Sequence, residues 1–420
     1  MQAIRRKNAS FERSAIYVMT LVLTAAVCAV TLGILSGLKL TRAAAGAPAL
    51  MIALGAGLSF AYRATGAPFL PSEWVAASAD TGLAALAFAA ATQLRVSRFA
   101  RHCPASFRLT VGGAPLFLIL CSLTAFVLAP QLSLPSALLV GAVLMLNGAA
   151  FDRRAVTNAP APAVVKATVR LESAAILALG VPVAALLEAN AAVSAPGLPA
   201  VTPLYETSLA LLKGFAMGGA LGVLFAKAGN WLRLRNGGGA FAVAAAAAGF
   251  LLSPLISAHP VIAATAAGLL WGEETKYPQA TRMRLRRSIE EAVGPAAYFA
   301  FGCLMAPRIF QADLLAVVFA LAAVTVMRAG PRLAALQTSS LPKESQAFLA
   351  WFGGAPGAAS ALFLISLIGG GSLVDQDAVF TIGAVAVTAG VVAARLTSRP
   401  LANAFLRETV AARKRRMFAG

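Results

Sequence analysis

The sequence predicts an all-α polytopic membrane protein with about thirteen transmembrane helices. Of its 420 residues, 59% are hydrophobic and only 12% are charged. This hydrophobic share is larger than a soluble domain can bury in its core. Apolar segments recur between residues 15 and 397, each close to the roughly 20 residues that span a bilayer core about 30 Å thick. Lys and Arg gather in alternate connections between these segments, as in membrane proteins of fixed orientation.

The first apolar segment, 15–38, follows four basic residues in the tail 1–14, as the hydrophobic part of a signal peptide also does. It is longer than the 7–15 residues of a signal core, so we expect a retained helix. The remaining predicted segments are 44–62, 75–94, 107–129, 134–156, 168–188, 205–226, 240–256, 258–272, 289–306, 312–336, 346–368 and 377–397. The division around Pro254 and Pro260 is the least obvious of these.

The placement of positive charge predicts the orientation. Alternate connections and segment ends hold 28 of the 35 Lys and Arg residues, and cytoplasmic connections are the ones that retain positive charge. This pattern predicts an integral protein of the plasma membrane, in bacteria the inner membrane, with its N-terminus outside. The C-terminus and the basic tail 398–420 are then cytoplasmic. The basic tail 1–14 argues against this orientation.

Several classes of function are not favoured by the composition. A net charge of +19 would suggest nucleic acid in a soluble protein, but its placement here follows membrane topology, so we expect lipid and not nucleic acid as a partner. The four cysteines and two histidines have neither metal-ligand nor disulfide spacing. No nucleophile–base pair or phosphate-binding loop is present. We expect neither an enzyme nor a cofactor.

Two segments contain residues that interrupt a helix. The fifth carries Asn147 and Gly148, and the twelfth carries Gly353-Gly354-Ala355-Pro356-Gly357; Gly and Pro disfavour helix interiors. In transporters, broken helices lie beside a cavity or ion site. The two breaks lie seven segments apart, which predicts inverted six-helix repeats around a linking helix. Close helix packing is the alternative reason for such glycines.

The seventh segment carries Gly214, Gly218 and Gly222 at four-residue spacing. This spacing puts three small residues on one helix face and allows a second helix to approach closely. Packing within the chain and a homodimer contact are the two interpretations.

At this point the chain resembles the monovalent cation:proton antiporters, the sodium/proton exchanger family. The resemblance rests on the order of short motifs. They are Leu83–Leu94 in the third segment, Ser136–Ala142 at the start of the fifth, Val169–Ser173 with Gly180–Val183 in the sixth, Ala350–Gly353 with Gly357–Ser360 in the twelfth, and Leu396–Leu401 at the end of the last.

The resemblance implies exchange of a monovalent cation, sodium or potassium, for protons by alternating access. It also implies one transmembrane domain over 15–397. Its moving core would comprise the helices of 107–188 and 312–397, and its scaffold and dimer part those of 15–94 and 205–306.

The ion site of the family is altered in this chain. The family's Thr-Asp-Pro falls on Asn147-Gly148-Ala149, and its Asn-Asp falls on Ile176 and Leu177, so both carboxylates are missing. The family's arginine at the second break falls on Ala355 or Pro356. Since an acid and a base are lost together, the charges of the half-helix ends stay closer to balance than after loss of one.

The remaining polar residues offer a reduced site. Glu172 is buried in the sixth segment and Arg328 in the eleventh, and an ion pair between them is one expectation. The alternative is that Glu172, Ser173 and Asn147 form a small cation or proton site. Asp152 is a further candidate carboxylate, although Arg153 and Arg154 follow it and favour a salt-bridged helix end.

Three functions fit the sequence. The first is a cation:proton antiporter with a degenerate site. The second is a transport-inactive relative that serves as a structural or regulatory membrane protein. The third is a transporter of an anion or a neutral solute, because an uncharged cavity between broken helices could accept either.

Overall fold

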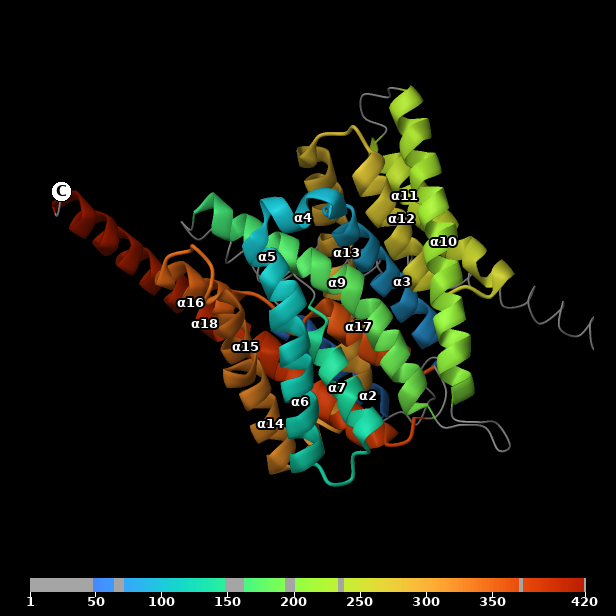
Figure 1. Ribbon diagram of the computed structural model, residues 1–420. Coiled ribbons are helices and arrows are strands. Elements are labelled where there is room, and N and C mark those ends of the chain that lie inside the picture. Colours follow the sequence, from blue (N-terminus) through green and yellow to red (C-terminus); the bar gives the residue numbers. More distant parts are fainter. Residues whose placement is uncertain are drawn as a thin grey trace, which may run out of the picture.

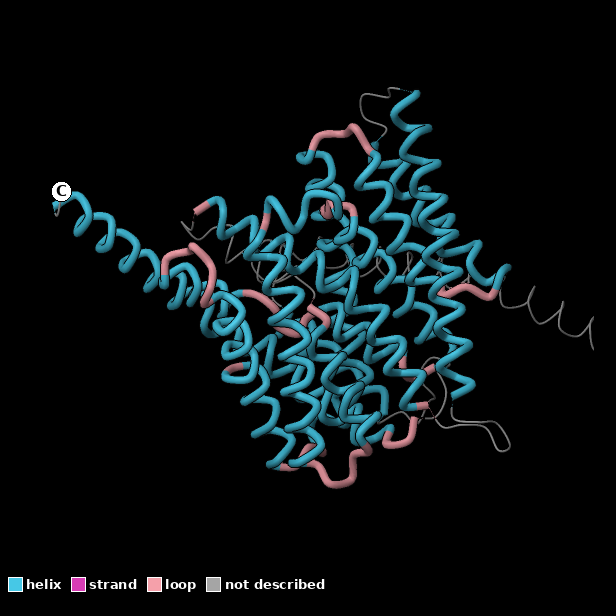
Figure 2. The backbone as a smooth tube through the Cα atoms, viewed as in Figure 1, coloured by secondary structure: helices cyan, strands magenta, loops and turns pink. Residues whose placement is uncertain are grey.

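The structure is a computed structural model that describes residues 48–63, 72–147, 162–192, 201–232, 238–369 and 373–418. Helices form nearly all of this part of the chain, and they run side by side in a bundle (Figures 1 and 2). Eight helices or helix pairs are long and apolar enough to cross a membrane, and two shorter apolar helices accompany them. The predicted all-α membrane fold is confirmed, while segment 15–38 lies outside the described residues.

The first half of the described chain follows the predicted segments closely. Segments of this kind form helices because no water is available in lipid to satisfy an open backbone. The helices are α2 Pro48–Arg63, α3 Ser72–Ala91, α4 Val96–His102, α5 Pro104–Arg108, π-helical η1 Leu109–Gly113, α6 Ala114–Leu128, α7 Leu134–Met145 and α9 Ala163–Ala191.

The second half contains the longest helices. The 43-residue α18 continues far beyond the predicted segment end at residue 397 and projects from the bundle (Figure 1), because the residues after Pro400 are mostly strong helix formers. The helices are α10 Val201–Leu232, α11 Gly238–Leu252, 3₁₀-helical η2 Ser253–Ile256, α12 Pro260–Glu274, α13 Gln279–Phe310, α14 Leu314–Val324, α15 Val326–Leu336, α16 Lys343–Phe352, α17 Ala358–Ser366 and α18 Gln376–Phe418.

Two divisions of the chain depend on single residues. Between η2 and α12, Ser257 adopts a left-handed conformation with φ of 55°, so the predicted separation of two segments at Pro254 and Pro260 is confirmed. The eleventh segment, expected as one helix, is divided at Thr325 into α14 and α15. Thr325 has φ of −107° and ψ of −90°, outside the helical region, so the helix is interrupted at this residue.

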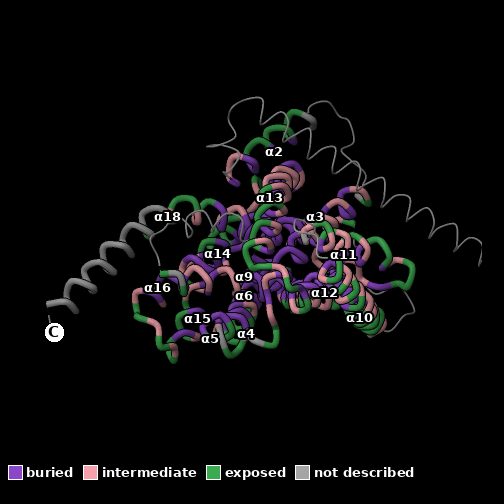
Figure 3. The backbone as a smooth tube through the Cα atoms, turned by 90° about the horizontal axis from the view of Figure 1, so that it is seen from above, coloured by how far each residue is buried: buried purple, intermediate pink, exposed green. Residues whose placement is uncertain are grey.

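The glycine face of α10 packs against α12 inside the chain. A Cβ atom on Gly218 would lie 2.0 Å from the Ala263 carbonyl oxygen, and one on Gly222 would lie 2.4 Å from that of Ala267. This arrangement supports packing within the chain over a dimer contact for this face. The opposite face of α10 is exposed, while buried residues fill the centre of the bundle (Figure 3).

We expect Gly218→Ala to destabilise the protein by about 1–3 kcal/mol or more, because backbone atoms on both sides of the contact cannot move aside as a side chain does. The matched control is Gly57→Ala in α2, where a Cβ atom would meet nothing within 4 Å. Thermal unfolding of the purified full chain in detergent measures the difference. Equal midpoints for the two variants would contradict the close packing of α10 on α12.

Candidate functional site

The two predicted helix breaks meet near the middle of the bundle. α7 ends at Met145, and the next two residues are extended. Across from them, residues 353–357 separate α16 from α17. The backbones of Asn147 and Pro356 pair in antiparallel fashion, although 209 positions separate them along the chain. The second half of the fifth segment lies outside the described residues, as do Gly148 and Asp152.

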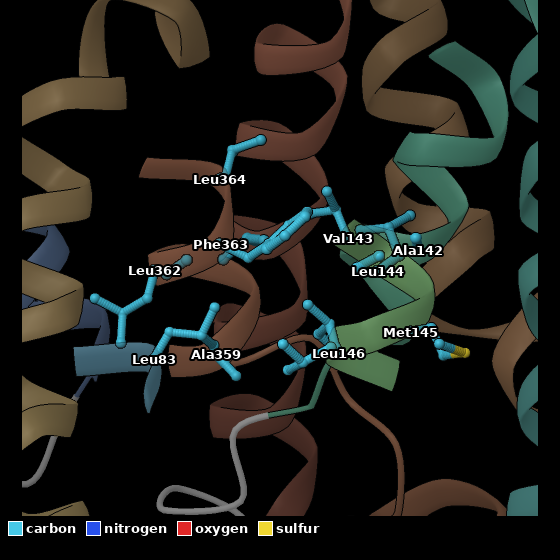
Figure 4. Close-up of a cluster of buried hydrophobic side chains, with 14 of the residues drawn as sticks. Leu83, Ala142, Val143, Leu144, Met145, Leu146, Ala359, Leu362, Phe363 and Leu364 are labelled. Atoms are coloured by element: carbon cyan, nitrogen blue, oxygen red, sulfur yellow. The ribbon is translucent and has the colours of Figure 1, made fainter. Parts of the chain in front are cut away.

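The crossing is closed by a serine at the start of α17. The Ser360 hydroxyl donates to the carbonyl oxygen of Leu146, and it accepts a bond of 3.4 Å from the Gly357 amide. The negative C-terminal end of α7 therefore faces the positive N-terminal end of α17. Figure 4 shows Leu146, Ala359 and Leu83 in one cluster of buried hydrophobic side chains. Within the described residues, these two helix ends thus balance each other without a carboxylate at their contact.

Asn147 is the polar side chain at the crossing. It is 3% exposed, and neither its Oδ1 nor its Nδ2 atom has a hydrogen-bond partner within the described part of the chain. Burying an amide without hydrogen bonds costs on the order of 1–3 kcal/mol. A polar group held this way fits a place where water or a solute binds.

Glu172 forms a buried ion pair, but its partner is Arg332 and not the expected Arg328. Both carboxylate oxygens accept from the Arg332 guanidinium, with 2.8 Å between Oε2 and Nη2. Glu172 is 0% and Arg332 4% exposed. Arg328 lies one turn earlier on α15, where its guanidinium is 5.3 Å from the centre of the Trp351 ring. The predicted pairing with Arg328 was therefore wrong by one helical turn.

Arg332 also compensates the end of a broken helix. Its Nη2 and Nε atoms donate to the Leu349 carbonyl at 2.8 and 3.2 Å, near the C-terminal end of α16, where the helix dipole is negative. The second break requires glycine at this point. Gly354 has φ of +68°, and a Cβ atom on Gly353 would collide with the Arg332 guanidinium. Arg332 thus supplies a positive charge at the break whose family arginine is missing.

The other predicted ligands do not join Glu172. Ser173 accepts a bond of 3.4 Å from Arg286 on α13, since adjacent residues point in different directions around a helix. Ile176 and Leu177, where the family's Asn-Asp falls, are buried among apolar side chains. Gly180 allows α9 to approach Leu146 and Met145. The predicted cation site of Glu172, Ser173 and Asn147 is therefore not assembled in this structure.

Two acidic residues inside predicted segments were overlooked in the sequence. Asp80 on α3 and Glu188 on α9 lie close enough for the charge of Asp80 to act on Glu188, and α3 packs along α9. Both side chains are partly exposed. In the described residues neither has a hydrogen-bond or ion-pair partner. Their position inside apolar segments could have identified them, because an ionisable residue within a membrane helix indicates a functional site.

Comparison with known proteins agrees with this geometry. The family model described as "Sodium/hydrogen exchanger, transmembrane" matches residues 16–402. The structure of the sodium proton antiporter MjNhaP1 from Methanocaldococcus jannaschii at pH 8 is similar, with a TM-score of 0.64 and 15% identity over 94% of this chain and 99% of that one.

A second structure of that antiporter, from an electron-microscopy map, gives a TM-score of 0.59 and 16% identity over 95% of this chain and 98% of the other. At such low identity, the structural similarity shows a shared fold and nothing more. A comparison with curated proteins gives no match. Because the family model spans nearly the whole chain, the protein belongs to the sodium/hydrogen exchanger family.

Proposed function

We propose that the protein is a secondary active transporter that exchanges a monovalent cation for protons by alternating access. The observation that carries the proposal is the crossing of two broken helices at Asn147 and Pro356. Unwound backbone is tolerated at membrane depth only where it is buried in protein or lines a cavity. In secondary transporters such breaks form the substrate site, and one helix group moves against the other around it.

The proposal assigns a structural role to the Glu172–Arg332 pair. A carboxylate that shares both oxygens with a buried guanidinium gives up its partner only at high cost. Exchange needs a carboxylate that gains and loses a proton during the cycle. Asp80 and Glu188, which have no partner in the described residues, are the carboxylates that we assign to proton exchange.

The proposal is tested by pH-gradient dissipation in inside-out membrane vesicles. We expect recovery of a pH-sensitive dye's fluorescence on addition of sodium, potassium or lithium chloride, and none in vesicles from cells that lack the protein. Choline chloride controls for chloride and osmotic effects. If no cation produces a response while the protein is present in the membrane, the exchanger proposal fails.

One observation favours a second candidate, a transport-inactive relative with a structural or regulatory role. The site has no carboxylate at the family positions, and Arg332 neutralises the acid that remains beside the second break. A protein of this kind would show no cation response in the same vesicles. It would still span the membrane and retain its fold.

A further inference from the structure

The N-terminal half of α13 carries two arginines that point into the protein. Arg282 and Arg286 are buried, with 6% and 2% exposure, while Arg284 and Arg287 between and after them are exposed. Residues four apart lie on one helix face, so the buried arginines are stacked one turn apart. They lie at the arginine-rich end of the bundle, which we define by α4, α5 and the start of α13.

Arg282 fixes this end of α13 to two neighbouring helices. Its Nη1 atom donates to the carbonyl of Thr92, just after α3, at 3.3 Å and to that of Gly272 in the last turn of α12 at 3.2 Å. A guanidinium at helix C-termini is favourable because carbonyl groups there lack helical partners. The Gln93 amide donates in return to the Arg282 carbonyl at 2.9 Å. α13 is therefore anchored to the α3–α12 side.

Arg286 extends from the same helix to α9. Its Nη1 atom donates to the Arg170 carbonyl at 3.3 Å, and its Nη2 atom donates to the Ser173 hydroxyl at 3.4 Å. Its Nε atom is paired with Glu290 at 2.7 Å, which orients the guanidinium toward α9. α9 and α13 otherwise pack together only sparsely. Long side chains thus provide much of the contact between the two helices.

The bonds to α9 are suited to being made and broken. Both are near the long limit for hydrogen bonds, and the Glu290 pair keeps the charge of Arg286 compensated when α9 moves away. α9 packs extensively along α7, which ends at the crossing. A shift of α9 away from α13 would therefore open the bundle between the arginine-rich end and Asn147.

We propose that Arg286 is a latch that holds α9 against α13 and keeps the route from the arginine-rich end to the helix crossing closed. The latch rests on the alternating access of the proposed function, although it can be observed without transport. In the closed state, Arg286 bridges to Arg170 and Ser173. In the open state, it keeps only Glu290.

The test measures how fast a cysteine at the crossing reacts with a membrane-impermeant maleimide. The reporter is Asn147→Cys in the full chain, with Cys28, Cys103, Cys121 and Cys303 replaced by serine. The latch is removed by Arg286→Met with Glu290→Met, which replaces both partners of this ion pair together. We expect labelling from the arginine-rich end to rise about fivefold or more, because release shifts the population toward the open state. Exposed Arg284→Cys, tested separately, identifies the vesicle orientation that presents this end.

The matched control is Arg287→Met with Glu291→Met. This pair has the same spacing and a bond of 2.8 Å, but both side chains are largely exposed, so we expect labelling equal to that of the parent. If the double variant folds poorly, Ser173→Ala takes its place. It removes one acceptor of Arg286 and no charge, so we expect a smaller increase in labelling. Labelling of the latch variants that does not exceed the control overturns the proposal. Faster labelling without cation exchange would leave the latch in place and remove only the proposed transport.

Discussion

Glu172→Ala is expected to lower the free energy of unfolding by about 3–5 kcal/mol, because it leaves the Arg332 guanidinium charged and without its carboxylate in the core. The pair uses both carboxylate oxygens, and neither residue is more than 4% exposed. Leu349 would remain the acceptor for Arg332, but one carbonyl does not neutralise a full charge. Denaturant titration of the detergent-purified chain measures the loss.

The double variant Glu172→Met with Arg332→Met separates the cost of a stranded charge from the value of the pair. Replacing both partners of a buried ion pair by apolar residues is often close to neutral. We therefore expect the double variant to be more stable than either single variant. Arg287→Ala, at an exposed pair, serves as the control and should resemble the parent. A double variant less stable than both singles would contradict this account of the site.

The helix breaks could be predicted from the sequence because their cause is local. Gly353, Gly354 and Pro356 disfavour a helix wherever they occur. The antiparallel contact between Pro356 and Asn147 could not be derived in this way, since it depends on how two distant segments are brought together. The contact is therefore a finding of the structure.

The partner of Glu172 shows where residue-level prediction fails. Arg328 and Arg332 share one face of α15, so helical periodicity alone cannot choose between them. The choice depends on the interruption at Thr325, after which α15 begins as a separate helix, and on the position of Leu349 near the end of α16. These are properties of the packed bundle. Asp80 and Glu188, by contrast, could have been identified from the sequence as charges inside apolar segments.

Asp80→Asn and Glu188→Gln are each expected to reduce cation-dependent proton exchange about tenfold or more, because an ionisable group inside the membrane that lacks a fixed partner marks a proton or ion pathway. The amides have nearly the same shape as the acids but cannot gain or lose a proton. The two carboxylates come from α3 and α9, which pack together. In the proposed mechanism, α3 belongs to the scaffold and α9 to the moving core. Initial rates of pH-gradient dissipation in inside-out vesicles measure the effect.

Glu206→Gln is the matched control, because Glu206 is also a carboxylate near a predicted segment end but lies on the exposed face of α10; its exchange rate should equal that of the parent. Full exchange in both Asp80→Asn and Glu188→Gln would exclude these residues as proton carriers and leave Glu172 as the candidate. In that case Arg332 would have to release Glu172 in each cycle, at the cost of breaking this buried pair. Loss of exchange in the Asp80 and Glu188 variants with unchanged thermal stability would instead support a proton pathway that runs between α3 and α9, away from the position that the family's carboxylates occupy.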